Sequence, residues 1–135
     1  MKSEYVAIAA FCCLAGLIYF YFEDQKREET LLPIKKNVIA NQHPLVLHFY
    51  SDSSATCKAY ELVLKKTLRP YENTIDCQDL NIGIENNNRL LHNCGAGGVP
   101  TTVIFDRKGN KIAKETGFLR ADELDKLLRQ AVSHR

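Results

Sequence analysis

The chain has 135 residues, which gives room for one domain with an appendage. Hydrophobic residues make up 45% of it and charged residues 25%, a globular balance that excludes wholesale disorder. The formal net charge is only +2, and basic residues are scattered among acidic ones, so the composition does not indicate nucleic-acid binding.

An uncharged run over residues 5–22 is the first feature along the chain. A helix of this length rises about 27 Å, close to the hydrocarbon thickness of a bilayer. Tyrosine and phenylalanine at the end of the run suit the membrane interface. We therefore predict a membrane anchor over residues 1–22 that crosses the membrane through residues 5–22. A cleaved signal peptide is the alternative, but the apolar run continues past the small-residue site near Ala15.

The basic residues around this run bear on which side of the membrane the domain occupies. Lys2 alone precedes the run, whereas Lys26, Arg27, Lys35 and Lys36 follow it. Counted in this way, the basic residues place the domain on the cytoplasmic side.

Residues 23–32 form a predicted charged linker, and residues 33–135 a predicted globular domain that opens with a short helix at Pro33. Residues 45–50 are nearly continuous in apolar side chains, which is typical of a strand covered on both faces. Ser53 or Ser54 is suited to cap the helix that follows. The further predicted elements are a helix over residues 55–68, a strand over 80–84, a helix over 87–93 capped by its asparagines, a strand over 101–105, a turn over 106–110, a returning strand over 111–115 and a helix over 121–132.

This order of elements predicts an α/β domain whose mixed sheet has helices on both faces. The sequence of this domain contains three local patterns: HFYSDSSATCK over residues 48–58, GGVPTTVIFD over 97–106 and ETGF over 115–118. Together they resemble the thioredoxin superfamily, whose fold is a central mixed sheet flanked by helices. Within that superfamily the chain is most similar to the C-terminal domain of the transmembrane thiol:disulfide interchange protein.

The resemblance places a redox motif at the turn into the helix over residues 55–68. The family carries Cys-x-x-Cys there, and its first cysteine is the nucleophile at the helix N-terminus. This chain has Ser54 at that position and Cys57 at the second. A serine hydroxyl cannot exchange with a disulfide, so the ordinary dithiol cycle is not expected. The family's buried aspartate on the preceding strand is replaced by His48.

Pro100 matches the proline that the family carries in the cis form beside this turn. The resemblance implies a cis Val99–Pro100 bond whose neighbouring backbone pairs with an extended segment of a partner. The candidate binding residues are therefore Ser54, Val99, Pro100 and Thr101. The alternative is that Pro100 only builds a turn of the fold.

The cysteines of the domain leave two readings open. Cys57 is either a buried, inert residue or a reactive thiol assisted by His48, which the family geometry places beneath it. Cys94 is the better partner for a disulfide with Cys57, because Cys77 lies toward the opposite end of the sheet.

No histidine or cysteine spacing predicts a metal site, and no cofactor is expected. The remaining histidines are interpreted as solvated; they are His43, His92 and His134.

The first functional hypothesis is a membrane-tethered module that binds or assembles a protein partner at a membrane complex. The alternative is a thiol-disulfide oxidoreductase or isomerase that uses Cys57 with another thiol, and a structural subunit is a third reading. Related tethered domains work on the periplasmic or lumenal side, so the resemblance favours that side over the cytoplasmic one.

Overall fold

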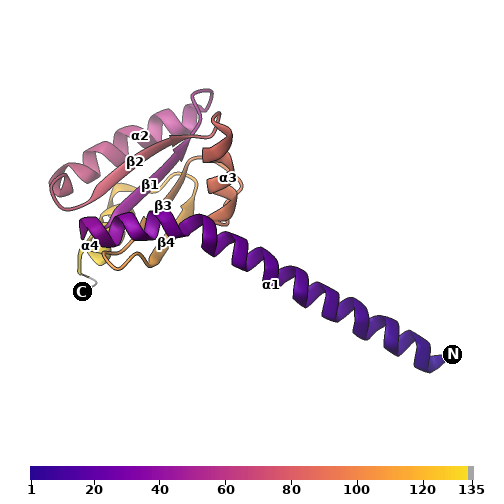
Figure 1. Ribbon diagram of the computed structural model, residues 1–135. Coiled ribbons are helices and arrows are strands. Elements are labelled where there is room, and N and C mark those ends of the chain that lie inside the picture. The colour runs from indigo at the N-terminus through magenta and orange to yellow at the C-terminus, as the bar shows by residue number, and fades with distance from the viewer. Residues whose placement is uncertain (134–135) are drawn as a thin grey trace. The chain divides into compact units, whose positions relative to one another are not determined.

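A computed structural model describes residues 1–133, apart from the side chains of Lys2 and Ser3. The chain divides into two compact units, and the second begins at Leu31 (Figure 1). The elements in chain order are α1 (Lys2–Asn41), β1 (Leu45–Tyr50), α2 (Ala55–Leu68), the short 3-10 helix η1 (Arg69–Tyr71), β2 (Asp76–Asn81), α3 (Glu85–Asn93), β3 (Thr101–Phe105), β4 (Lys111–Thr116) and α4 (Ala121–Ser133).

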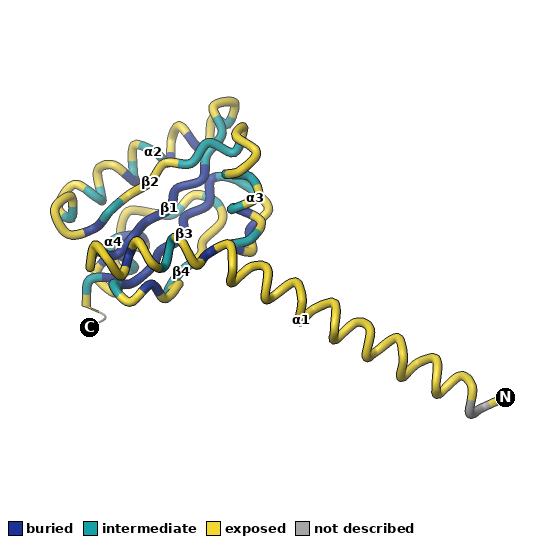
Figure 2. Tube along the Cα trace, viewed as in Figure 1, coloured by how far each residue is buried: buried dark blue, intermediate teal, exposed yellow. Residues whose placement is uncertain are grey.

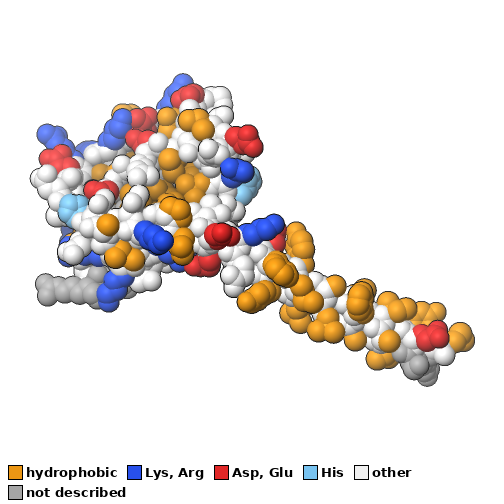
Figure 3. Space-filling view, in the orientation of Figure 1, with side chains coloured by type: hydrophobic (Ala, Val, Ile, Leu, Met, Phe, Trp, Pro, Cys, Tyr) orange, Lys and Arg blue, Asp and Glu red, His pale blue; other side chains and the backbone are white. Residues whose placement is uncertain are grey.

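The first unit consists of the N-terminal part of α1. Hydrophobic side chains cover most of this part of the helix on the face shown in Figure 3, and its described residues are all exposed. Within Glu4–Asn41 the most apolar window has a mean hydropathy of 2.1 and none of it is buried in the protein. By length and composition, this helix is therefore a candidate membrane span.

Helix α1 differs from the prediction, which had a linker over residues 23–32 and a new helix at Pro33. One helix runs through both segments, with Pro33 inside it. A proline removes one backbone hydrogen bond. The charged residues before it are good helix formers, and Leu31 and Val38 on either side of it are buried in the domain core.

The second unit is built on a four-stranded sheet of described residues in the order β2-β1-β3-β4. Strand β1 pairs parallel with β2 and antiparallel with β3, and β4 is antiparallel to β3. Figure 2 shows that the two central strands are buried, whereas β2 and β4 are more exposed. The predicted mixed sheet is confirmed.

Alternate residues of β1 enter two separate cores, one on each face of the sheet. Leu47 and Phe49 pack with the end of α1 and with α3. Val46 packs on the other face with α2 and α4. The side chains that these helices bury are Leu31, Val38 and Leu91 on the first face and Tyr60, Leu64, Leu124 and Leu128 on the second.

The predicted bounds of β1, α2 and β3 match the structure, but those of β2 and α3 do not. Strand β2 begins at Asp76, whereas the apolar residues had indicated 80–84. It lies at the edge of the sheet, and its polar side chains are therefore compatible with a strand. Helix α3 begins at Glu85, and no side chain caps it. The amide of Asn87 donates instead to the Asn81 carbonyl at 3.0 Å, so the predicted asparagine cap is wrong.

Candidate functional site at the Ser54 turn

Ser54 lies at the start of α2, directly after the turn that leaves β1. Its backbone is extended, and its Oγ accepts a hydrogen bond from the backbone N–H of Cys57 at 3.2 Å. The predicted cap is thus confirmed, and Ser54 is the residue that provides it. A side-chain oxygen at this position satisfies one of the free N–H groups of the helix end.

Cys57 lies in the first turn of α2 and is 2% exposed. Its thiol is free in the structure. A thiolate must reach a disulfide in order to attack it, so burial works against reaction with a large partner. The geometry favours the inert reading of Cys57 over the reactive one.

His48 is 1% exposed and faces its neighbours on the sheet and on α2. Its Nδ1 donates to Oδ1 of Asp79 at 2.9 Å, and Asp79 lies directly opposite it on β2. The imidazole stacks on Tyr50 at 5.7 Å between ring centroids and meets Tyr60 edge-on at 5.6 Å. Among the described residues, the hydrogen-bond partner of the imidazole is therefore a β2 carboxylate, and Nε2 is buried with no partner.

The Pro100 loop lies at the same end of the sheet as the Ser54 turn, because Phe49 near the end of β1 pairs with Thr101 at the start of β3. The Val99–Pro100 peptide bond is cis. The Pro100 carbonyl accepts from the Gly117 N–H at 2.8 Å. Within the described part of the chain, the N–H and C=O of Val99 have no hydrogen-bond partner.

Thr101 is fully buried, and its hydroxyl serves the fold. It donates to the Gly98 carbonyl at 2.7 Å and lies 3.0 Å from the hydroxyl of Thr116. Of the predicted binding residues in this loop, Val99 therefore offers free backbone groups, whereas the side chain of Thr101 is already engaged.

Phe118 is a further exposed residue at this end of the sheet, and in the sequence it is marked only as the last residue of the ETGF pattern. It is 48% exposed, and its ring meets Tyr60 edge-on at 5.6 Å between centroids. The Tyr60 hydroxyl is hydrogen-bonded to Thr102 at 2.7 Å. Burial raises the pKa of Tyr60 to about 12, although the hydrogen bond to Thr102 opposes this effect. Tyr60 thus gives Phe118 a fixed, uncharged support.

Cys94 is buried on the far side of the sheet from α2, at the C-terminal end of α3. Burial raises the pKa of its thiol to about 11, while Lys111 and Lys114 act in the opposite direction. Cys57 and Cys94 are both free thiols, on helices that cover opposite faces. Their disulfide stays a prediction.

The other histidines do not join this site. Nδ1 of His43 lies 3.4 Å from Oδ1 of Asp76, so His43 has a side-chain partner besides solvent. His92 is exposed, and His134 lies outside the described residues. Among the described residues, no three His, Cys, Asp or Glu side chains are grouped in a way that could hold a metal ion.

Comparison with known families shows which family the chain belongs to. The model of the thioredoxin-like domain family matches residues 34–132. The chain belongs to the thioredoxin-like domain family. It is also 30% identical over 91 residues to a thylakoid membrane protein of Synechocystis sp., a match that covers 64% of this chain. The match covers 45% of that relative, so the chain spans about half the length of the curated protein that it matches.

Solved structures resemble the thioredoxin-like domain at the level of the fold. An uncharacterized thioredoxin-like protein from Clostridium perfringens has a TM-score of 0.61 and 23% identity, over 70% of this chain and 78% of that one. A mutant thioredoxin from Halobacterium salinarum has a TM-score of 0.60 and 21% identity, over 73% of this chain and 83% of that one. Together with the family match, these similarities confirm the predicted thioredoxin fold.

Proposed function

We propose that this protein is a membrane-tethered, thioredoxin-like module that binds a segment of a protein partner and does not run a dithiol cycle. The observation that carries the proposal is the Ser54 hydroxyl, which caps α2 where a nucleophilic cysteine is needed. Disulfide exchange requires a thiolate, and a hydroxyl at a helix N-terminus does not supply one. Cys57 is buried, and the motif has no second thiol to pair with it, because residue 54 is a serine.

The backbone of Val99 gives the proposed binding surface its polar part. Its N–H and C=O are unpaired among the described residues, and such groups pair with an extended segment by strand addition. The exposed ring of Phe118 follows Gly117, whose N–H is bonded to the Pro100 carbonyl, and it offers apolar area nearby. Hydrogen bonding and apolar contact are both available without a reactive thiol.

The proposed tether is the apolar part of α1, with residues 1–22 as the anchor and the thioredoxin-like domain from residue 33 onward. The candidate span and the membrane-protein relative support membrane association. A tether raises the effective concentration of the module at a membrane complex. We propose that the domain faces the periplasmic or lumenal side.

The test is photo-crosslinking from Phe118, with a benzophenone amino acid at that position in the full chain and in native membranes. We expect a crosslinked partner that forms equally in the Cys57→Ser background. Val99→Pro removes the free N–H and should reduce crosslinking by about tenfold, whereas the exposed control Leu62→Ala on α2 should not. An adduct that needs Cys57 and is released by reductant would support the oxidoreductase alternative instead.

A further inference from the structure

Strand β2 forms an open edge of the sheet. Among the described residues, its only strand neighbour is β1. The N–H of Asp76 donates to the Pro44 carbonyl and that of Ile82 to the Tyr50 carbonyl, both at 2.9 Å. Backbone groups alternate in direction along a strand, so the N–H and C=O groups of Cys77 and Asp79 point away from β1. These groups are a free template for another strand.

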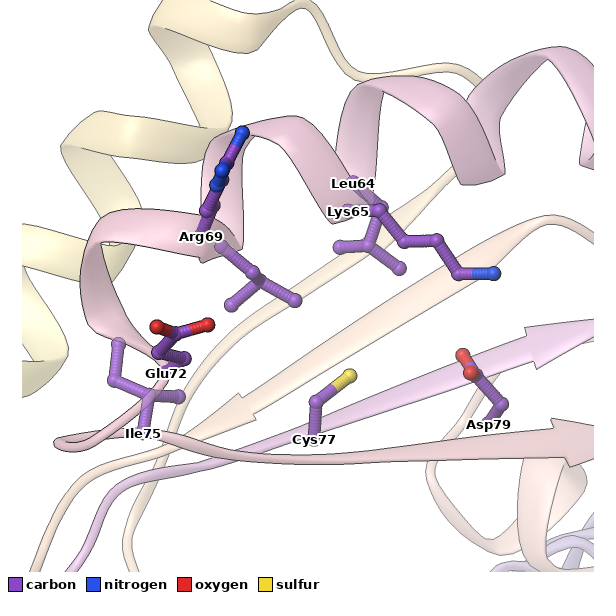
Figure 4. Close-up of a pocket in the computed structure, with 8 residues that line it drawn as sticks. Leu64, Lys65, Arg69, Glu72, Ile75, Cys77 and Asp79 are labelled. Carbon is purple, nitrogen blue, oxygen red and sulfur yellow. The ribbon is translucent and has the colours of Figure 1, made fainter.

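A groove of about 490 Å³ runs between this edge and α2, on the side toward which Cys77 and Asp79 project (Figure 4). The thiol of Cys77 points toward α2, and desolvation raises its pKa, with a smaller contribution from Asp79. The thiol is therefore largely neutral at physiological pH and acts as an apolar surface. The groove's apolar lining is completed by Leu64, Leu68 and Ile75.

A second hollow, of about 240 Å³, adjoins Asp79 and is acidic. Its carboxylates are Asp52, Glu61 and Asp79. The side-chain amide of Asn81 donates to Asp52 at 2.6 Å, and Lys65 forms an ion pair with Glu61. Buried His48 also lines it. Nδ1 of His48 is hydrogen-bonded to Asp79, and its buried Nε2 has no hydrogen-bond partner among the described residues. The hollow is thus suited to a cationic N–H donor.

We propose that the edge of β2 binds an extended segment of a partner protein that carries an apolar residue and a Lys or Arg two positions apart. Residues paired across two strands project on the same face, and alternate residues lie about 6.6 Å apart along each strand. The apolar side chain, opposite Cys77, enters the groove. The basic side chain, opposite Asp79, enters the acidic hollow. Strand β1 separates this edge from β3 and the Val99 loop, so the proposal does not rest on the proposed function.

The test measures fluorescence anisotropy of two labelled seven-residue threonine peptides with the full chain in detergent micelles. One peptide has Leu at its third position and Lys at its fifth, and the other has these two exchanged. We expect only one of the two peptides to bind saturably. The order of Leu and Lys in that peptide shows whether the added strand runs parallel or antiparallel to β2. Replacing its Lys by Glu should weaken binding at least about tenfold, because it places a carboxylate against Asp79.

Two variants test the edge itself. Cys77→Pro removes an outward N–H and should weaken binding about tenfold with an unchanged circular dichroism spectrum, because an edge strand tolerates proline at such a position. Gln78→Ala, whose side chain projects from the opposite face, is the matched control and should bind normally. Asp79→Asn should weaken the Lys peptide but not a peptide with norleucine in its place.

Three results would overturn the proposal. The first is that neither peptide binds. The second is that the Lys and Glu peptides bind equally. The third is that Cys77→Pro leaves peptide binding intact and instead changes the sedimentation of the protein, which would make β2 a contact between copies of this chain.

Discussion

Ser54 and Cys57 differ from a redox pair by one atom, the oxygen in place of a sulfur. The oxygen accepts the Cys57 N–H at 3.2 Å, and the same turn of α2 holds the buried thiol. A thiol at residue 54 would be a poorer cap, but it would sit where the helix end favours a thiolate. We therefore attribute the proposed lack of dithiol chemistry to this single side chain.

The substitution Ser54→Cys tests this role of the serine. We expect the variant to form a reducible disulfide with Cys57 on oxidation and to gain activity in insulin reduction, at a cost of about 1 kcal/mol in stability from the lost cap. Mass spectrometry and denaturant unfolding measure the two effects. Ser53→Cys is the matched control and should gain neither. A Ser54→Cys variant that forms no disulfide would show that the turn geometry, and not the serine, prevents the chemistry.

Among the helices and strands, the sequence predicted correctly those whose bounds depend on local signals. Continuous apolar residues marked β1 and β3, and a serine cap before α2 with Pro70 after it set the bounds of that helix. The predicted position of β2 was wrong for two reasons. The polar residues of this exposed edge strand resemble a loop, and the apolar residues that follow the strand belong to a turn. The continuation of α1 through Pro33 depends on core contacts that no local signal reveals.

The same distinction applies to the candidate site. The cap at Ser54 and the position of Pro100 follow from short patterns in the chain. The pairing of His48 with Asp79 depends on the register between β1 and β2. It could not be predicted, because the predicted start of β2 was four residues too late. The contact of Phe118 with Tyr60 joins a loop to a helix far away in the sequence. Such contacts come from strand pairing and packing and could not be predicted from the spacing of residues.

In the whole molecule, the surroundings of α1 change near Thr30. Before that point its described side chains are all exposed. Residues 5–22 are uncharged, as a membrane span requires, whereas residues 23–30 are polar or charged. After it, Leu31 is 4% exposed and Val38 2% exposed, and both belong to the core that covers one face of the sheet. The end of the helix is thus part of the folded domain.

Two truncations test this division. Removal of residues 1–30 should yield a soluble, cooperatively folded domain, while the full chain should resist extraction from membranes at alkaline pH. Removal of residues 1–41 also deletes Leu31 and Val38 and should lower the free energy of unfolding by at least about 3 kcal/mol, since full burial of a Leu or Val side chain contributes about 1.5–3 kcal/mol. Thermal unfolding followed by circular dichroism measures the difference. Equal stability of the two fragments would contradict a structural role for the end of α1.

Differential alkylation in native membranes tests whether the Ser54–Cys57 site performs thiol exchange. Cys57, Cys77 and Cys94 are labelled before and after reductant, and each site is read by mass spectrometry. We expect Cys57 to label slowly, because it is buried, and reductant not to change its labelling. Cys57 in a reducible bond, to Cys94 or to another protein, would contradict the proposed lack of thiol exchange and show that the site is redox-active without a cysteine at residue 54.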